Sequence, residues 1–327
     1  MGHVTLINGK QFTADATTSI LEAALGHDVV LEYSCRTGRC GICKAQVLSG
    51  ETIILKPEES LPAEEAERGM ILTCCRAAEN DVVLDAEDLA PLAGITVRTL
   101  PCKIAAIAFP SPDIAKVTLR TPPATPLTFL AGQYVDILHR DIRRSYSIAN
   151  APRADGTLEL VIKRYPGGML SRYWFEEAAV GDLLRLEGPL GTFFLRDQPV
   201  DHLVLLATGT GIAPVKAILE QLSMQDGPVP ARISVYWGNR DPAEFCIDLG
   251  CGALDFSTNL LLSRRNMGTG HREGYVQHAV LDDAVDLTGA AVYACGSNAM
   301  IASARTSLTE AGLPQRRFFS DAFVSSN

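Results

Sequence analysis

The feature that most restricts this chain is a set of four cysteines, Cys35, Cys40, Cys43 and Cys74. The first three lie in the run SCRTGRCGICK, and C-x4-C-x2-C followed by a distant cysteine is the spacing that holds a plant-type 2Fe-2S cluster. A tight loop must present three sulfurs to one side, and Gly38 and Gly41 suit it because glycine permits positive φ angles. Amides turned inward by such a loop can donate hydrogen bonds to the cluster sulfurs. The spacing therefore predicts an iron–sulfur loop and one-electron chemistry.

Two other uses of cysteine fit the sequence less well. A structural zinc site usually shows paired C-x2-C knuckles, and this chain has a single such pair, Cys40 and Cys43. A disulfide framework belongs to short secreted chains, whereas this chain has 327 residues. The fourth ligand stays open at this point, because Cys74 and Cys75 are adjacent.

Composition indicates a globular protein of two or three domains. Apolar residues make up 47% and charged residues 20% of the chain. No run approaches the roughly eighteen uninterrupted apolar residues that a membrane span needs, so we expect no membrane segment. The first residues lack the basic segment and apolar core of a secretory signal. Nine cysteines without an export signal favour the reducing cytoplasm.

The negative charge gathers on the cysteine-bearing segment. Residues 1–93 hold 15 acidic against 7 basic residues, while the remainder holds 23 against 22. The densest acidic run is Glu58, Glu59, Glu64, Glu65 and Glu67. Such a run is usually a solvated face, and the alternative is a docking patch for a basic partner. The acidic balance argues against nucleic acid as a ligand.

The first segment, residues 1–92, predicts a small mixed α+β sheet. Four short strand-like runs accompany one main helix near residues 19–25, with Ser19 as a candidate N-cap. A proline and a glycine between residues 89 and 94 then indicate a linker.

Two further segments follow. Residues 98–199 contain six strand-like runs separated by Gly, Pro and Asp turns, which predicts a six-stranded antiparallel β-barrel. One helical stretch, residues 167–178, falls between the fifth and sixth runs. Residues 200–327 alternate strands with helices, which predicts a parallel, doubly wound α/β sheet.

A glycine turn follows the first strand of the last segment. The run LVLLATGTGIAPVKAILEQL has the order strand, turn, helix, and Gly209 and Gly211 would let backbone amides approach a pyrophosphate at the helix N-terminus. Pro214 stands where the dinucleotide fingerprint has its third glycine, and a first helical turn tolerates proline. The turn alone is weak evidence for a nucleotide site, and its strand–turn–helix setting strengthens it.

The barrel segment carries two more motifs. In RRSYSIAN, strand alternation places Arg144 and Tyr146 on one face and Ser147 on the other. Residues of these types also serve as ordinary packing and surface groups in strands. Two glycines before LSRYWFEE form either a phosphate cradle or a flexible turn.

The order of these motifs resembles the ferredoxin–NAD(P)H reductase superfamily. More narrowly, it resembles the three-domain members with an N-terminal plant-type ferredoxin module, such as reductase components of bacterial oxygenases and the reductase of CDP-6-deoxy-glucoseen synthesis. The likeness covers essentially the whole chain and rests on the cysteine run, R-x-Y-S, G-G-x-x-S and G-x-G-x-x-P together. It implies a β-grasp-like 2Fe-2S domain, an FAD-binding barrel and an NAD(P)-binding domain.

The resemblance also implies roles for residues that match the family motifs. It implies Cys74, in ILTCCR, as the fourth iron ligand in preference to Cys75. The implied FAD contacts are Arg144 at the pyrophosphate, Tyr146 against the isoalloxazine, Ser147 near flavin N5, Ile162 and Lys163 near the flavin or its adenosine, and Gly168, Met169 and Ser171 at the phosphates. The implied nicotinamide-nucleotide site is Gly209, Thr210, Gly211 and Pro214, with Cys295 and Gly296 beside the nicotinamide. Ser147 and Cys295 are expected to align the two rings.

The residues leave the choice of nicotinamide nucleotide open. No acid stands about twenty residues beyond Gly211 to bind a ribose, since Asp241 and Glu244 come later. Ser263 and Arg264 follow a predicted strand end, where a guanidinium would suit a 2′-phosphate. We expect NADH, because relatives fused to a ferredoxin mostly use it, with NADPH as the alternative.

We therefore interpret the chain as a reductase that passes electrons from NAD(P)H through FAD to the cluster and on to a protein partner, either an oxygenase component or a deoxysugar dehydrase. No side-chain acid or base is required, so residues that position the cofactors matter most. The alternatives are a self-contained reductase of small acceptors such as quinones, and a redox-sensing module. Phe323 either covers the flavin or packs as an ordinary phenylalanine. We expect a monomer with neither nucleic acid nor membrane as a partner.

Overall fold

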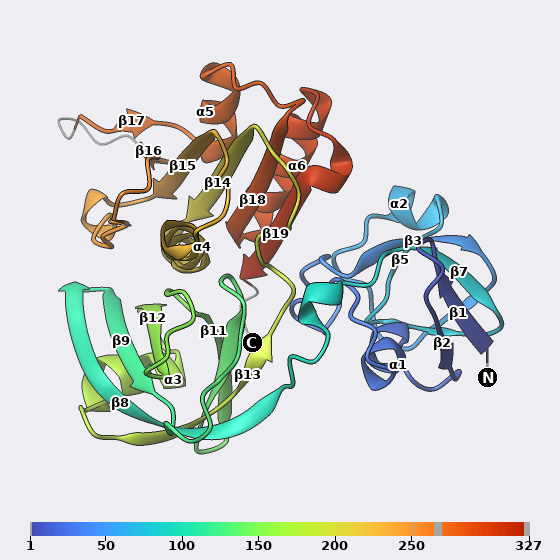
Figure 1. Cartoon of the computed structure of the whole chain (residues 1–327), viewed down its shortest axis with the longest axis horizontal. Coiled ribbons are helices and arrows are strands. Elements are labelled where there is room, and N and C mark those ends of the chain that lie inside the picture. Colours follow the sequence, from blue (N-terminus) through green and yellow to red (C-terminus); the bar gives the residue numbers. More distant parts are fainter. Residues whose placement is uncertain (1, 251, 265–269, 324–327) are drawn as a thin grey trace. The chain divides into compact units, whose positions relative to one another are not determined.

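The computed structural model describes residues 2–250, 252–264 and 270–323. The chain divides into two compact units, residues 1–95 and residues 96–327 (Figure 1). A mixed sheet, a six-stranded antiparallel sheet and a parallel sheet follow one another along the chain, so the predicted fold class is confirmed. None of the helices in the described residues is long and apolar enough to cross a bilayer.

The first unit is built on a five-stranded sheet with the order β2-β1-β7-β3-β5. Its strands are β1 (Gly2–Leu6), β2 (Gln11–Ala14), β3 (Lys44–Ser49), β5 (Met70–Leu72) and β7 (Val82–Asp85). β1 and β7 run parallel and the other neighbours run antiparallel, which makes the sheet mixed as predicted. The smaller elements are β4 (Thr52–Ile54), which pairs with β6 (Arg76–Ala78), and the short helix α2 (Ala63–Glu67).

The predicted main helix forms as α1 (Ile20–Gly26). Ser19 caps it: the Ser19 hydroxyl accepts from the amide of Glu22 at 3.2 Å and donates to the Glu22 carboxylate at 3.0 Å. These bonds satisfy a backbone donor that the first helical turn cannot pair internally. The helix buries Ile20 and Leu21 in the core of the unit, which holds the sheet against it.

All six strand-like runs of the second segment form strands of one antiparallel sheet with the order β11-β10-β13-β8-β9-β12. They are β8 (Arg98–Ser111), β9 (Ile114–Arg120), β10 (Tyr134–His139), β11 (Ile142–Ser147), β12 (Thr157–Lys163) and β13 (Leu183–Leu190). The two edges meet where Ile148, just beyond β11, bridges to Leu160 of β12. There the amide of Ala149 also donates to the carbonyl of Glu159 at 2.7 Å. We call this contact between residues 148–149 and 159–160 the barrel seam, and it curls the sheet into the predicted barrel.

The helical interruption of the barrel has two parts. Helix α3 (Met169–Arg172) continues directly into one π-helical turn, η2 (Tyr173–Glu177). Trp174 of this turn is fully buried in the barrel core. The helical interruption therefore covers the barrel core, and it starts at the phosphate-cradle motif.

The last segment forms a six-stranded, wholly parallel sheet with the order β17-β16-β15-β14-β18-β19. Its strands are β14 (His202–Thr208), β15 (Arg232–Asn239), β16 (Ser257–Leu262), β17 (Arg272–Glu273), β18 (Ala290–Ser297) and β19 (Phe318–Phe323). Its helices are α4 (Ile212–Met224), α5 (Val276–Asp282) and α6 (Asn298–Glu310). β15 lies on one side of β14 and β18 on the other, so the strand order reverses between β14 and β18. Open α/β sheets bind ligands beyond the carboxyl ends of the strands at such a switch point.

Helix α4 connects the parallel sheet to the barrel within the second unit (Figure 1). Its buried residues Ile212 and Val215 share one hydrophobic core with Ala149 and Val161 of the barrel. The helix that follows the glycine turn therefore packs directly on the barrel seam.

Candidate functional site

The loop from residue 35 to 43 turns its backbone amides toward cysteine sulfurs. The amide of Cys35 lies 3.5 Å from the Cys40 sulfur, and the amide of Thr37 lies 3.4 Å from the Cys35 sulfur. Gly38 has φ +79°, and a Cβ at this position would collide with the carbonyl oxygen of Pro57. The loop therefore needs a glycine there, both for its backbone angle and for its close packing.

The third and fourth predicted ligands, Cys43 at the end of this loop and Cys74, lie side by side. The Cys43 and Cys74 sulfurs are 3.3 Å apart, and both residues are buried. The amide of Gly38 also donates toward the Cys74 sulfur. Cys75 differs, because its thiol donates to the carbonyl of Pro57 at 3.5 Å. The contacts of Cys74 suit a ligand better than those of Cys75, and the choice of Cys74 stays a prediction.

The surroundings favour a thiolate at two of the four cysteines, Cys35 and Cys74, whereas hydrogen bonds to these two and burial raise the pKa values of Cys40 and Cys43. A hydrogen bond from Cys40 lowers the pKa of Cys35 to about 5, and one from Cys43 lowers the pKa of Cys74 to about 7. Thiolate is the form that binds iron. Amides directed at the sulfurs are the hydrogen bonds that tune an iron–sulfur cluster. The donor set and its loop therefore fit a 2Fe-2S group.

The acidic run beside this loop is more paired than a solvated face would be. Glu58 is held by the Arg76 guanidinium at 2.8 Å and by the amide of Leu72 at 2.7 Å, so it is a structural residue. Glu59 lies 3.3 Å from Arg39, and Glu65 pairs with Lys44. The other two acids of the run, Glu64 and Glu67, are exposed on α2.

The R-x-Y-S motif lies on β11 with the predicted alternation. Tyr146 is half-buried, and its hydroxyl accepts from the indole nitrogen of Trp174 at 3.0 Å. Burial raises the pKa of Tyr146 to about 12, which keeps the phenol neutral. Ser147 is buried on the opposite face. Arg144 donates to the carbonyl of Arg143 at 2.7 Å, and among the described residues it has no carboxylate partner.

The other predicted FAD residues lie at the end of β12 and the start of α3. Ile162 points into the barrel core, and the Lys163 ammonium lies 2.7 Å from a carboxylate oxygen of Glu244. Both side chains therefore already have partners within the protein, so only the backbone of these two residues is left to contact a cofactor. At α3, the Ser171 hydroxyl accepts from the amide of Tyr165 at 2.8 Å. A Cβ on Gly168 would come within 3.2 Å of the Ser171 Cβ, while Met169 projects outward with 63% of its surface exposed.

The glycine turn lies at the switch point of the parallel sheet. The turn, Gly209–Gly211, directly follows β14, and Thr210 at its centre is half-buried. A Cβ on Gly211 would collide with the carbonyl oxygen of Cys295, and one on Gly296 would collide with the Thr208 hydroxyl. The carboxyl ends of β14 and β18 therefore approach each other so closely that positions 211 and 296 have no room for a Cβ. Pro214 is buried in the first turn of α4.

Two strands contribute the remaining predicted nucleotide residues. Cys295, at the end of β18, is fully buried, and burial raises its pKa well above the ordinary value, so the thiol is neutral. Ser263 and Arg264 are exposed just beyond β16. Phe323, the last residue of β19, is half-buried against the core of the parallel sheet. A role for Phe323 over the flavin stays a prediction.

The structure adds residues that the sequence did not point out. Glu159 is almost buried on β12 and lies within ion-pair distance of Arg153 and of Lys216 on α4. The only signal for them in the sequence is an acid inside the buried strand run TLELVIK, because a buried carboxylate requires partners.

Three family models match the chain, in the same order as the mixed sheet, the barrel and the parallel sheet. They are the 2Fe-2S iron-sulfur cluster binding domain over residues 5–79, the oxidoreductase FAD-binding domain over residues 101–195 and the oxidoreductase NAD-binding domain over residues 205–306. The three predicted cofactors, a 2Fe-2S cluster, FAD and NAD(P)H, therefore each have a matching domain.

Relatives match over nearly their whole length. The CDP-6-deoxy-L-threo-D-glycero-4-hexulose-3-dehydrase reductase of Yersinia pseudotuberculosis is 41% identical, covering 98% of this chain and 97% of the relative. The reductase component of propane 2-monooxygenase from Mycolicibacterium smegmatis is 32% identical, covering 94% and 92%. Among solved structures, an Amycolatopsis cytochrome P450 reductase matches with a TM-score of 0.74 and 29% identity, covering 99% of each chain.

The cysteine loop, the barrel and the switch-point turn agree with these matches along the full length of the chain. The chain belongs to the ferredoxin–NAD(P)H reductase family with an N-terminal 2Fe-2S domain, and it is an oxidoreductase that passes electrons from NAD(P)H through FAD and the cluster to a partner.

Proposed function

We propose that the partner is a dehydrase that acts on a CDP-linked 6-deoxyhexulose. The observation that supports this is the 41% identity with the Yersinia dehydrase reductase over 98% of the chain. The oxygenase-system relatives reach 32% for a propane monooxygenase reductase and 29% for a naphthalene dioxygenase reductase from Ralstonia. Each of these relatives is matched over more than nine-tenths of its length, so the difference in identity favours the sugar enzyme.

The residues of the chain act in this scheme by binding and orientation. When bound, FAD supplies the conversion of a hydride pair into single electrons, and the cluster supplies one-electron transfer. Arg144 holds the FAD diphosphate, and Ser147 and Cys295 align the flavin with the nicotinamide. The four thiolates of Cys35, Cys40, Cys43 and Cys74 hold the iron. Because every cofactor site lies on one chain, we propose a monomer, and because the ligand thiols must stay reduced, we place it in the cytoplasm.

The partner is tested by reconstitution. Purified holoprotein and NADH are combined with a CDP-6-deoxyhexulose dehydrase and its substrate, or with the terminal component of an oxygenase and its substrate. We expect product formation with the dehydrase and little with the oxygenase. The reverse result would assign the chain to an oxygenase system. Turnover with quinones but with neither protein would indicate a self-contained reductase, and no turnover with any acceptor would indicate a sensor.

Replacing Arg144 by alanine should weaken FAD binding by about ten- to a hundredfold. A hydrogen bond to a charged group contributes about 1.5–3 kcal/mol, and each 1.4 kcal/mol is tenfold in affinity. The measurement is the FAD content and the FAD dissociation constant of the purified protein, with iron content as an internal check. Arg143→Ala is the matched control, because Arg143 instead binds Asp136 and Glu187, at 3.2 and 2.7 Å. Equal FAD binding in both variants would contradict the phosphate role.

We expect kcat/KM for NADH to exceed that for NADPH. The exposed pair Ser263 and Arg264 offers one guanidinium near the ribose position, which allows weak use of NADPH. Arg264→Ala should then lower kcat/KM for NADPH about tenfold and leave that for NADH within about twofold, since one charge-assisted bond to phosphate is lost. A wild-type protein that prefers NADPH would overturn this assignment.

A further inference from the structure

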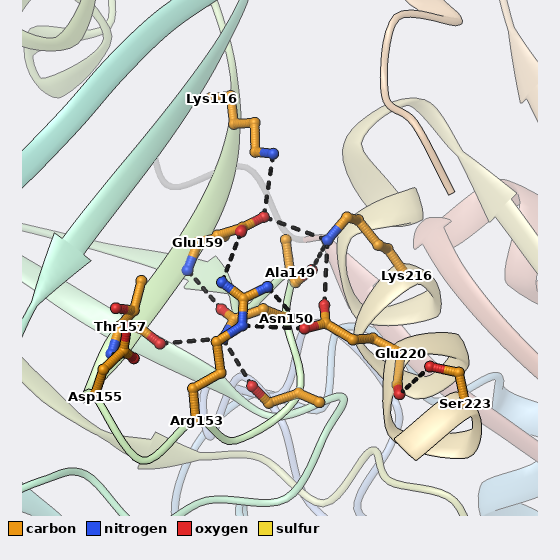
Figure 2. Close-up of polar contacts among 11 residues, drawn as sticks. Lys116, Ala149, Asn150, Arg153, Asp155, Thr157, Glu159, Lys216, Glu220 and Ser223 are labelled. Carbon is orange, nitrogen blue, oxygen red and sulfur yellow. Dashed lines mark hydrogen bonds and ion pairs between the residues drawn. The ribbon is translucent and has the colours of Figure 1, made fainter. Parts of the chain in front are cut away.

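A group of four charged side chains joins the barrel to helix α4 (Figure 2). Its members are Arg153 and Glu159 from the barrel, and Lys216 and Glu220 from α4, and we call it the charge cluster. A fifth residue, Lys116 of β9, the strand that pairs with β12, lies 3.3 Å from Glu159, and among the described residues it makes no ion pair with α4. The cluster is one polar part of the contact between the barrel and the parallel sheet.

Glu159 is the centre of the charge cluster. Its side chain is 11% exposed, and its two oxygens accept from Arg153 at 2.9 Å and from Lys216 at 3.3 Å. Burial raises the pKa of Glu159, but Lys216, Lys116 and Arg153 outweigh it and the pKa is lowered overall. The carboxylate is therefore charged, and its geometry is fixed because a buried charge without its partners is strongly unfavourable.

Lys216 connects the two predicted cofactor sites through a single ammonium group. Its side chain is 12% exposed, and its nitrogen lies 3.1 Å from the carbonyl oxygen of Ala149 and 3.3 Å from the carboxylates of Glu159 and Glu220. Ala149 stands two residues after Ser147, at the barrel seam. Lys216 stands five residues after Gly211, in the second turn of α4. A shift of the glycine turn relative to β11 would therefore break this bond.

A second ion pair restrains the same strand. Residues 159, 161 and 163 of β12 share one face. Val161 packs in the core shared with α4, and Lys163 pairs with Glu244 at 2.7 Å. Glu244 lies in a 3-10 turn, Pro242–Glu244, that follows β15. Two ionic contacts on either side of an apolar one fix the angle between the barrel and the parallel sheet as well as their separation.

We propose that Lys216 and its charge cluster are positioning residues for hydride transfer: they hold the glycine turn of α4 in register with the end of β11, so that the nicotinamide meets the flavin. No member of the cluster acts on the cofactors directly. The inference depends on the proposed placement of FAD at β11 and of the nucleotide at the Gly209–Gly211 turn.

Lys216→Met tests the inference, because methionine keeps much of the side-chain length and removes the charge. The holoprotein is mixed with NADH under anaerobic conditions, and the rate of flavin reduction is followed at saturating NADH. We expect this rate to fall about tenfold with FAD and iron content unchanged, since misplacement of reacting groups by about 1 Å costs up to about a hundredfold. Lys116→Met is the matched control, because it removes an ammonium at the same 3.3 Å from the same carboxylate without touching α4, and it should change the rate by less than about twofold.

A second readout does not depend on turnover. Hydrogen–deuterium exchange in the oxidised protein without nucleotide should be faster at residues 148–150 and in the first turns of α4 in Lys216→Met, and unchanged there in Lys116→Met. Lys216→Arg, which restores the cation, should recover most of the flavin-reduction rate. If Lys216→Met does not fold, Glu220→Gln decides the question: slower flavin reduction at an unchanged melting temperature supports the proposal, and an unchanged rate overturns it.

Other outcomes overturn the inference while leaving the proposed function intact. A Lys216→Met protein with a lower melting temperature but a normal rate of flavin reduction would make the charge cluster purely structural. Equal slowing of flavin reduction in Lys216→Met and Lys116→Met would mean that the effect comes from the lost positive charge and not from the contact with α4. Failure of the proposed cofactor placement would instead show in the Arg144 variant, which is independent of α4.

Discussion

Replacing Cys74 by serine is expected to remove the visible absorbance and the iron of the 2Fe-2S cluster while FAD stays bound. The Cys74 sulfur lies 3.3 Å from that of Cys43 and receives the amide of Gly38, so its loss leaves three thiolates for two irons. NADH-driven delivery of electrons to a protein acceptor should fall by more than about a hundredfold, because loss of a group that merely supports a metal ligand already costs about 10–100-fold. Flavin reduction by NADH should continue, since the barrel and the parallel sheet are untouched.

Cys75→Ser is the matched control for this experiment. Cys75 is the adjacent residue and is equally buried, yet its thiol donates to the carbonyl of Pro57, a bond that a serine hydroxyl can also make. Iron content and absorbance should therefore match the wild type. If Cys75→Ser loses the cluster and Cys74→Ser keeps it, the two assignments must be exchanged.

Replacing Gly211 by alanine should remove most of the NADH-driven reduction of the flavin. The added Cβ would collide with the Cys295 carbonyl oxygen and come within 3.1 Å of the Gly296 Cα, so the turn must move away from the end of β18. Such overpacking costs about 1–3 kcal/mol. A displacement of about 1 Å at a reacting centre lowers the rate by up to about a hundredfold. The measurement is the anaerobic flavin-reduction rate as a function of NADH concentration, with FAD and iron content unchanged.

Gly227→Ala controls for the general effect of adding a methyl group. Gly227 lies in the loop after α4 and has open space around it, so its substitution should leave the rate unchanged. A Gly211→Ala protein with a normal rate would mean that the nucleotide binds away from this turn. That result would withdraw the nucleotide assignment and leave the cluster ligands unaffected.

The sequence predicted the longer strands and helices of this fold because each of them carries its own local signal. The six barrel strands were predicted from strand-like runs and the turn residues between them. Helix α1 was predicted from its candidate N-cap, Ser19, and the residues that follow it. Helix α2 and the short strands β4, β5, β6 and β17 were not predicted. All of them are at most five residues long, and such short segments offer little periodicity.

The sequence predicted chemistry where the residues are close together in the chain, and missed contacts that depend on packing. The iron loop could be inferred because three of its ligands lie within nine residues. Lys216 and Glu159 are 57 residues apart, and neither is unusual in its own element. Glu58 was likewise expected to be a solvated acid. It is a structural residue, because it pairs with Arg76, which is 18 residues away in the chain. Pairings of this kind become visible only when the fold brings the chain together.

Strand β12 has a consequence for any attempt to recombine this reductase with its relatives. One face of the strand fills the barrel with Leu158, Leu160 and Ile162, and the other presents Glu159 and Lys163 to helix α4 and the turn after β15. In a chimera whose crossover separates residues 153–163 from residues 216–244, the two surfaces that make these contacts would come from different parent proteins. Crossovers before residue 98 leave these contacts intact, so the iron–sulfur module is the part that can be exchanged while the flavin and nucleotide parts are inherited as one piece.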